Sequence, residues 1–190
     1  MDTTEIRLCG IGGQGLILGA RVLAKALVSE GRKVAQSQSY EPTSRGELSR
    51  ADLLVGDEAP DYPLATALDL ALILDQAAAG ACDGLLKPSA MVLADSEKVP
   101  APPQGAFTTY SYPFAAAAAE LGTTRAANMA ALGALVALSG ICAPESLIGA
   151  IGAIGSRSHL ARNTDAVHAG LRMVRDASPV PDPAKPRPGS

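Results

Sequence analysis

The stretch from Gly10 to Gly15 (Gly-Ile-Gly-Gly-Gln-Gly) constrains the fold of this chain more than any other. It follows a short segment in which apolar residues alternate, Glu5 to Cys9, and it precedes a largely apolar run from Leu16 to Glu30. This order predicts a strand, a tight glycine turn and a helix. In such an arrangement backbone N–H groups and a helix N-terminus face a crevice, which suits an anionic or strongly polar ligand.

The spacing of these glycines matches the G-x-G-x-x-G pattern of dinucleotide-binding turns. That pattern also requires an acidic side chain at the end of the second strand, which we expect over Lys33 to Ser39. The first acidic residue after this strand is Glu41, so the carboxylate that would bind a ribose is missing or displaced. Two interpretations of the turn stay open: a ligand site, or glycines that only permit a close turn between strand and helix.

The rest of the sequence predicts a single α/β domain over residues 1–177. Further strands are expected over residues 50–56, 68–74, 90–95 and 107–111, with a short helix over 76–82. After Pro113 the pattern becomes helical, and helices are expected over residues 114–121, 125–139, 144–154 and 157–177. This order favours a three-layer α/β/α fold with a mostly parallel sheet and a helical C-terminal part. Residues 178–190 are rich in proline and are expected to be extended or disordered.

The charge and aromatic content argue against a protein that binds nucleic acid. The net charge is −3, aromatic residues make up 3% of the chain, and there is no Trp. Both a basic surface for phosphates and a platform for stacking bases are therefore lacking. The hydrophobic content of 47% is typical of a chain with a packed core.

The three cysteines, Cys9, Cys82 and Cys142, are far apart and form no CxxC pair. This spacing predicts no zinc, iron–sulfur or other metal site in the chain. Their apolar neighbours favour buried thiols in a reducing compartment, and the first residues lack the pattern of a signal peptide. We therefore expect a cytoplasmic protein.

Residues 126–144 carry no charge and approach the length of a membrane span. They are rich in Ala and Gly and include Asn128 and Ser139, so we expect a helix buried in a protein core or at a subunit contact, and no membrane association. A lone Asn at such a position usually forms a hydrogen bond at the helix start. His159 and His168 are not spaced as a metal pair on one helix face, and we expect both to be surface or helix-cap groups.

The loop from Ser39 to Glu47 (Ser-Tyr-Glu-Pro-Thr-Ser-Arg-Gly-Glu) is the second feature that could carry chemistry. Because it follows a strand, it should lie near the glycine turn, where the strands of an open sheet end. Its hydroxyl groups, the phenol of Tyr40 and the guanidinium of Arg45 could orient a carboxylate or a phosphate. The alternative is a solvated turn with an Arg–Glu pair.

Taken together, these stretches resemble the gamma subunit of 2-oxoacid:ferredoxin oxidoreductases. The stretches that carry the resemblance are residues 5–15, 38–46, 49–52, 61–63, 128–134 and 163–170. They follow one another in order and without large gaps over about residues 4–172. The form Gln38-Ser39-Tyr40 looks most like the subtype found with 2-oxoglutarate enzymes.

The resemblance implies a complex that oxidatively decarboxylates a 2-oxoacid with coenzyme A, giving acyl-CoA, CO2 and reduced ferredoxin, or NADH. It also implies that thiamine diphosphate, magnesium and iron–sulfur clusters lie on partner alpha, beta and ferredoxin-like subunits, with none of them bound by this chain alone. This chain would complete the active-site and coenzyme A region, and alone it would be inactive. The implied cofactor-binding residues are Gly10, Gly12, Gly13, Gln14, Gly15, Ser39, Tyr40, Arg45, Gly46 and Asn128, with Arg45 as the candidate anion contact and no certain catalytic residue.

The chain departs from the family pattern in the loop, which is usually Ser-Tyr-Gly-Pro-Glu-x-Arg-Gly-Gly. Glu41 and Glu47 replace its first and last glycines, and extra acids near the site would repel a second carboxylate on the substrate. An aryl, indolyl or branched-chain 2-oxoacid therefore stays open beside 2-oxoglutarate. Two other functions also stay open: a stand-alone nucleotide- or flavin-binding oxidoreductase domain, and a subunit that only holds an assembly together.

Overall fold

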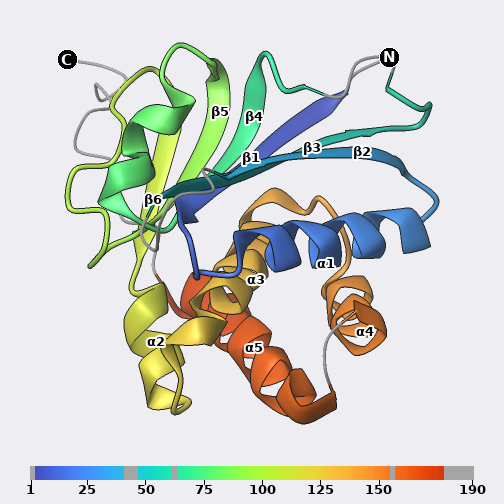
Figure 1. The fold of residues 1–190 in the computed structure, drawn as a ribbon, viewed down its shortest axis with the longest axis vertical. Helices are drawn as coiled ribbons and strands as arrows, with labels where there is room; N and C mark the ends of the chain where they lie inside the picture. Colours follow the sequence, from blue (N-terminus) through green and yellow to red (C-terminus); the bar gives the residue numbers. More distant parts are fainter. Residues whose placement is uncertain (1–2, 41–46, 61–63, 155–156, 178–190) are drawn as a thin grey trace.

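A mixed sheet of six strands lies at the centre of the chain (Figure 1). The computed structural model describes residues 3–40, 47–60, 64–154 and 157–177, and every structural statement below refers to these. The strand order is β2-β3-β1-β4-β5-β6. The strands are β1 (Thr4–Ile11), β2 (Lys33–Tyr40), β3 (Leu48–Gly56), β4 (Leu68–Ile73), β5 (Leu86–Asp95) and β6 (Thr108–Tyr112).

The sheet is mostly parallel, as predicted, because β1, β4, β5 and β6 run in one direction. Strand β3 is antiparallel to both of its neighbours, β1 and β2. The predicted order of strand, glycine turn, helix and second strand is present as β1, α1 and β2, but β2 does not pair with β1. The hairpin that joins β2 to β3 folds back so that β3 inserts between β2 and β1.

Helices cover one face of the sheet, and a short 3₁₀ helix lies on the other (Figure 1). The α-helices are α1 (Leu16–Ser29), α2 (Phe114–Glu120), α3 (Ala127–Ser139), α4 (Pro144–Ile154) and α5 (Leu160–Asp176). The 3₁₀ helices are η1 (Gln76–Cys82), η2 (Thr124–Ala126) and η3 (Arg157–His159). The predicted three layers are thus present, with η1 as the thin third layer.

Strand β1 shows how the alternation of side chains separates the two faces. Ile6 and Leu8 belong to the large core that the sheet shares with α1, α3, α4 and α5. Cys9 belongs to a smaller cluster with Ala78 and Cys82 of η1 on the opposite face. Arg7 and Cys9, the residues on either side of Leu8, therefore point toward η1 and away from the main helical layer.

Helix α3 is the centre of the helical layer and is buried along most of its length. It packs closely against α5, because a Cβ at Gly133 would overlap the backbone of Val167, and a Cβ at Gly170 would overlap the backbone of Ala130. The expectation of a helix buried in the protein core is confirmed. In the part of the chain that the structure describes, no helix combines the length and apolar character needed to cross a membrane.

Most predicted elements are present within a few residues of their expected ends. Two predicted helices are each divided, since the start of the expected 125–139 helix is the 3₁₀ turn η2 and the start of the expected 157–177 helix is η3. Strand β5 begins at Leu86, earlier than expected, because it includes two exposed residues, Pro88 and Ser89, before its buried half. The tail 178–190 lies outside the described residues.

Candidate functional site

The side chain of Gln14 bridges the ends of β1 and β4. Its Oε1 accepts a hydrogen bond of 2.8 Å from the N–H of Ile11, and its Nε2 donates one of 2.9 Å to the carbonyl oxygen of Leu74. After β1 the chain builds the side of the sheet that holds β3 and β2, and β4 then starts the opposite side, with β5 and β6. The ends of β1 and β4 are therefore the switch point at which open α/β sheets bind nucleotides. Here an amide of the protein itself links the two strand ends.

Two glycines of the turn make room for side chains of this chain. A Cβ at Gly10 would overlap Gln14 Oε1. A Cβ at Gly15, whose φ is +73°, would lie 2.7 Å from Asn128 Nδ2. Gly13 differs, because its φ is +97° and nothing lies within 4 Å of where its Cβ would be. Gly13 is therefore the turn residue with open space beside it.

A pocket of about 360 Å³ opens beside Gly13 and Gly15. Three helices begin at this pocket: α1 after Gly15, α3 after Ala126 and α5 after His159. The start of α1 has no side-chain cap. Helices α3 and α5 continue from the 3₁₀ turns η2 and η3, and Thr123 caps the start of η2, since its Oγ1 accepts a hydrogen bond from the N–H of Arg125. The first-turn N–H groups of a helix carry partial positive charge and lack partners within the helix, so their convergence favours an anion.

The charged side chains that line this pocket are basic. Arg125 and Arg162 border it together with His159, and no acidic residue of the described chain does so. His159 is an exposed residue at the N-cap of α5, and His168 is exposed on the same helix, which agrees with the prediction of surface or cap groups. Sequence reasoning did not single out the two arginines, although each lies within a few residues of a predicted helix start.

Asn128 borders the same pocket and is only 2% exposed. Its Nδ2 donates a hydrogen bond of 2.8 Å to the carbonyl oxygen of Gly15. Because a carbonyl can only accept, this contact fixes the orientation of the amide. Its Oδ1 is then shielded from solvent without a hydrogen-bond partner. A donor group on a bound ligand would satisfy this oxygen.

The sequence placed Asn128 as a helix-start group. The position is right, since the residue lies in the first turn of α3, but its side chain bonds the carbonyl oxygen of Gly15, the N-cap of α1. Asn128 therefore joins two helix starts that are far apart in the sequence.

A second pocket of about 290 Å³ adjoins the first, since both are lined by Gly13 and Arg125. It lies at the carboxyl ends of β4 and β5 and is lined by Asp75, Asp95 and Lys98 among others. Asp95 is 1% exposed and accepts hydrogen bonds from the N–H groups of residues 97, 98 and 115. Its charge is thus compensated within the protein. We call the two adjoining pockets the groove.

The loop after β2 ends beside the glycine turn, as predicted. The N–H of Gly12 donates a hydrogen bond of 2.8 Å to the carbonyl oxygen of Glu47, and Ile11 pairs with Leu48 at the end of the β1–β3 ladder. Ser39 is exposed near the end of β2, and Tyr40 is its last residue. Arg45 and Gly46 lie outside the described residues.

No cluster of three or more His, Cys, Asp or Glu side chains able to hold a metal ion occurs among the described residues. Cys9, Cys82 and Cys142 are buried free thiols.

Comparison with known proteins agrees with this architecture. The family model for pyruvate ferredoxin/flavodoxin oxidoreductase matches residues 5–173. The 2-oxoglutarate synthase subunit KorC of Archaeoglobus fulgidus is 39% identical over 138 residues, which cover 72% of this chain and 71% of that protein.

Two solved structures share the fold. The gamma subunit of a keto/oxoacid ferredoxin oxidoreductase from Geobacter sulfurreducens is 32% identical, with a TM-score of 0.80 over 92% of this chain and 99% of that one. The 2-oxoglutarate:ferredoxin oxidoreductase from Magnetococcus marinus, solved with 2-oxoglutarate, coenzyme A and succinyl-CoA bound, has a TM-score of 0.80 at 22% identity. Its match covers 94% of this chain and 32% of that one, and at this identity it speaks for the fold alone. The chain therefore belongs to the pyruvate ferredoxin/flavodoxin oxidoreductase family, as a gamma-type subunit of a 2-oxoacid:ferredoxin oxidoreductase complex.

Proposed function

We propose that this chain supplies one wall of the coenzyme A site in its complex, and that the groove beside Gly13 binds the phosphate-bearing part of coenzyme A. The observation that carries the proposal is the convergence of the starts of α1, α3 and α5 on one pocket, with Arg125 and Arg162 at its border. Phosphate oxygens accept hydrogen bonds from helix N-termini and from guanidinium groups. The buried Oδ1 of Asn128 adds an acceptor for an N–H or O–H group of the same ligand.

A nucleotide bound at the β1/β4 switch point, as in a stand-alone dinucleotide or flavin domain, is not favoured. The side chain of Gln14 is held across the ends of β1 and β4 by two hydrogen bonds, and no acidic residue ends β2 to bind a ribose. The groove runs from the ends of β1 and β4, past the turn, toward the start of α5. A ligand there would lie at the surface of this subunit, where a partner chain could complete its site.

Thiamine diphosphate, bound with magnesium, supplies the carbanion chemistry that decarboxylates a 2-oxoacid. We propose that alpha and beta partner subunits hold it, that a ferredoxin-like subunit holds the iron–sulfur clusters, and that the complex is cytoplasmic. The three free thiols of this chain support a reducing compartment. The role left to the residues of the groove is to bind and orient coenzyme A so that its thiol meets the acyl group formed on the partner subunits.

We propose 2-oxoglutarate as the substrate, because the curated relative at 39% identity is named a 2-oxoglutarate synthase subunit. A panel of 2-oxoacids tested with the assembled complex decides this. The highest kcat/KM for 2-oxoglutarate is expected, and a preference for an aryl, indolyl or branched-chain 2-oxoacid would refute the assignment.

Photoaffinity labelling tests the proposed wall. The assembled complex is incubated with a coenzyme A analogue that carries a diazirine on the adenine ring, illuminated and digested. Label is expected on peptides of this chain that contain residues 123–129 or 159–163, and unmodified coenzyme A should compete it away. Label confined to the partner chains, or to the surface of α4, would contradict the proposal.

Arg45 is proposed as a further anion contact from the loop that ends at the glycine turn. Replacement of Arg45 by Ala in the reconstituted complex is expected to raise the KM for coenzyme A or for the 2-oxoacid. Unchanged turnover and unchanged KM values for both would remove Arg45 from the site.

A further inference from the structure

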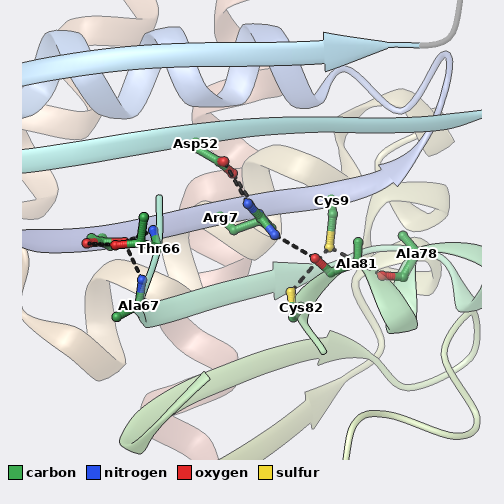
Figure 2. A network of polar contacts seen from close by, with 9 residues as sticks. Arg7, Cys9, Asp52, Thr66, Ala67, Ala78, Ala81 and Cys82 are labelled. Atoms are coloured by element: carbon green, nitrogen blue, oxygen red, sulfur yellow. Dashed lines mark hydrogen bonds and ion pairs between the residues drawn. The ribbon is translucent and has the colours of Figure 1, made fainter. Parts of the chain in front are cut away.

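A buried ion pair on the face of β1 that points toward η1 fixes a positive charge in the protein interior (Figure 2). The guanidinium of Arg7 binds the carboxylate of Asp52 through Nε and Nη2, each at 2.8 Å. Its Nη1 donates a hydrogen bond of 2.6 Å to the carbonyl oxygen of Ala81. The side chain of Arg7 thus links β1, β3 and the end of η1, directly before Cys82.

Cys9 and Cys82 lie beside this ion pair, as Figure 2 shows. Their Sγ atoms are 4.0 Å apart, and both residues are fully buried. Cys9 Sγ also lies 3.6 Å from the carbonyl oxygen of Ala78. The two thiols lie 73 residues apart in the sequence, on β1 and η1, yet their sulfur atoms are in direct contact.

The surroundings make the two thiols unequal. The hydrogen bond with Cys9 lowers the pKa of Cys82, although burial opposes this shift, and the positive charge of Arg7 lowers the pKa of both thiols. The hydrogen bond with Cys82 and burial raise the pKa of Cys9. Cys82 is therefore the thiol that ionises more readily, and Cys9 is the protonated partner. A thiolate is the reactive form of cysteine.

Cys82 borders a surface pocket, although the residue itself is 0% exposed. It lines a pocket of about 200 Å³ with Pro103, Gln104 and Phe107, and the exposed residues Asp83 and Gly84 border its rim. Such a volume holds several water-sized molecules, since one water takes up about 30 Å³ in the liquid. A small neutral oxidant can enter this pocket, and it reaches Cys82 when the end of η1 opens locally.

We propose that Cys9 and Cys82 form a reversible disulfide when the protein meets a hydroperoxide. The Cys82 thiolate attacks one peroxide oxygen, the O–O bond breaks, and a sulfenic acid forms on Cys82 while hydroxide leaves and takes up a proton as water. The sulfur of Cys9 then attacks the sulfur of Cys82, the S–O bond breaks, and the Cys9 proton leaves with the second hydroxide as water. The dithiol loses two electrons, and hydrogen peroxide is reduced to two waters.

The geometry requires only a local movement. A disulfide bond is about 2 Å long, so the two sulfur atoms must approach each other by roughly 2 Å from their present contact. Cys82 is the last residue of a short 3₁₀ helix, and such helices have weaker hydrogen-bond geometry than α-helices. The bond would tie η1 to the strand that ends in the glycine turn. The proposal does not depend on what the groove binds.

The experiment treats the purified full chain with hydrogen peroxide, denatures it, blocks free thiols with an alkylating reagent, and measures intact and peptide masses. Two of the three thiols should become resistant to alkylation, with the mass lower by two hydrogen atoms and a linked peptide that joins Cys9 to Cys82. Dithiothreitol should reverse the change. Cys142 should remain a free thiol and be alkylated after denaturation, because burial raises its pKa to about 12 and no other cysteine contacts it.

Two matched variants complete the test. Cys142→Ser should form the same linked peptide at the same rate as the unmodified chain. Cys9→Ser should leave a sulfenic acid on Cys82 that dimedone traps. If Cys9 and Cys82 of the unmodified chain both stay alkylatable under peroxide, or if Cys142 is oxidised before them, the proposal is overturned, whether or not either variant folds.

Discussion

The Nδ2 atom of Asn128 donates a hydrogen bond of 2.8 Å to the carbonyl oxygen of Gly15, a residue 113 positions earlier. This single contact joins the start of α3 to the start of α1 and directs the donor side of the amide toward the protein. The acceptor side, Oδ1, is left without a partner next to the pocket.

Replacement of Asn128 by Ala should raise the KM for coenzyme A by about 5- to 10-fold, because one hydrogen bond contributes about 1 to 1.5 kcal/mol. The KM for the 2-oxoacid should not change. Steady-state kinetics of the reconstituted complex measures both. Ser139→Ala, at the other end of the same helix, is the matched control, and an equal rise for that variant would mean a general loss of α3 stability.

Gly10 and Gln14 should behave as a coupled pair, since a Cβ at Gly10 would overlap Gln14 Oε1. Gly10→Ala should lower the free energy of unfolding by about 1 to 3 kcal/mol through overpacking. Gln14→Ala should remove part of that penalty when the two changes are combined. Urea denaturation of the two single variants and the double variant gives the coupling energy. Additive effects would show that Gly10 does not make room for Gln14.

The Arg7–Asp52 pair should be far more costly to break than to replace. Asp52→Asn should lower the free energy of unfolding by about 3 to 5 kcal/mol, because it leaves a buried guanidinium without a counter-charge. The double variant Arg7→Met/Asp52→Leu should recover most of that loss. Chemical denaturation measures both. A loss below about 0.5 kcal/mol for Asp52→Asn would contradict the buried pair.

Much of the glycine turn and its flanking elements could be predicted, since local patterns determine them. The strand before Gly10 and the helix after Gly15 follow from hydrophobic periodicity and glycine spacing. The position of β3 between β1 and β2 could not be predicted in the same way, because strand pairing depends on contacts between distant segments. The pocket was missed for the same reason: Gly15, Ala126 and His159 are brought together only by the packing of α1, α3 and α5.

The contacts of Gln14 could have been predicted in part from the sequence. The missing acid after the second strand argued against a dinucleotide at the turn, and a glutamine inside a glycine turn is long enough to reach a neighbouring strand end. Its partner, the carbonyl oxygen of Leu74, could not be found without the sheet order. Arg125 and Arg162 left a weaker signal, because exposed arginines near helix starts are common.

Glu30 should give the protein a component of stability that depends on pH. Hydrogen bonds from the Ser146 side chain and from the N–H of Ala143 lower the pKa of this carboxyl from its ordinary value of 4.5, and the Ala143 bond is 2.7 Å long. Because the folded pKa is depressed, the contribution is complete above the unfolded pKa and is lost as the pH falls through the folded one.

The measurement compares the unmodified chain with Glu30→Gln, which keeps an acceptor oxygen but no charge. The unmodified chain should be the more stable at neutral pH, by a modest amount because Glu30 is exposed. The difference should vanish in acid below the folded pKa. A difference that stays constant over this range would mean that the charge of Glu30 contributes nothing.

The most direct test of the central claim is the KM for coenzyme A of a complex that carries Arg125→Gln and Arg162→Gln together. If the pocket at the three helix starts binds the phosphates, this KM should rise about tenfold, equivalent to about 1.4 kcal/mol, while the KM for the 2-oxoacid and kcat stay unchanged. Arg172→Gln, an exposed arginine on α5 outside the pocket, should change none of these values. An unchanged KM for coenzyme A in the double variant would contradict the account.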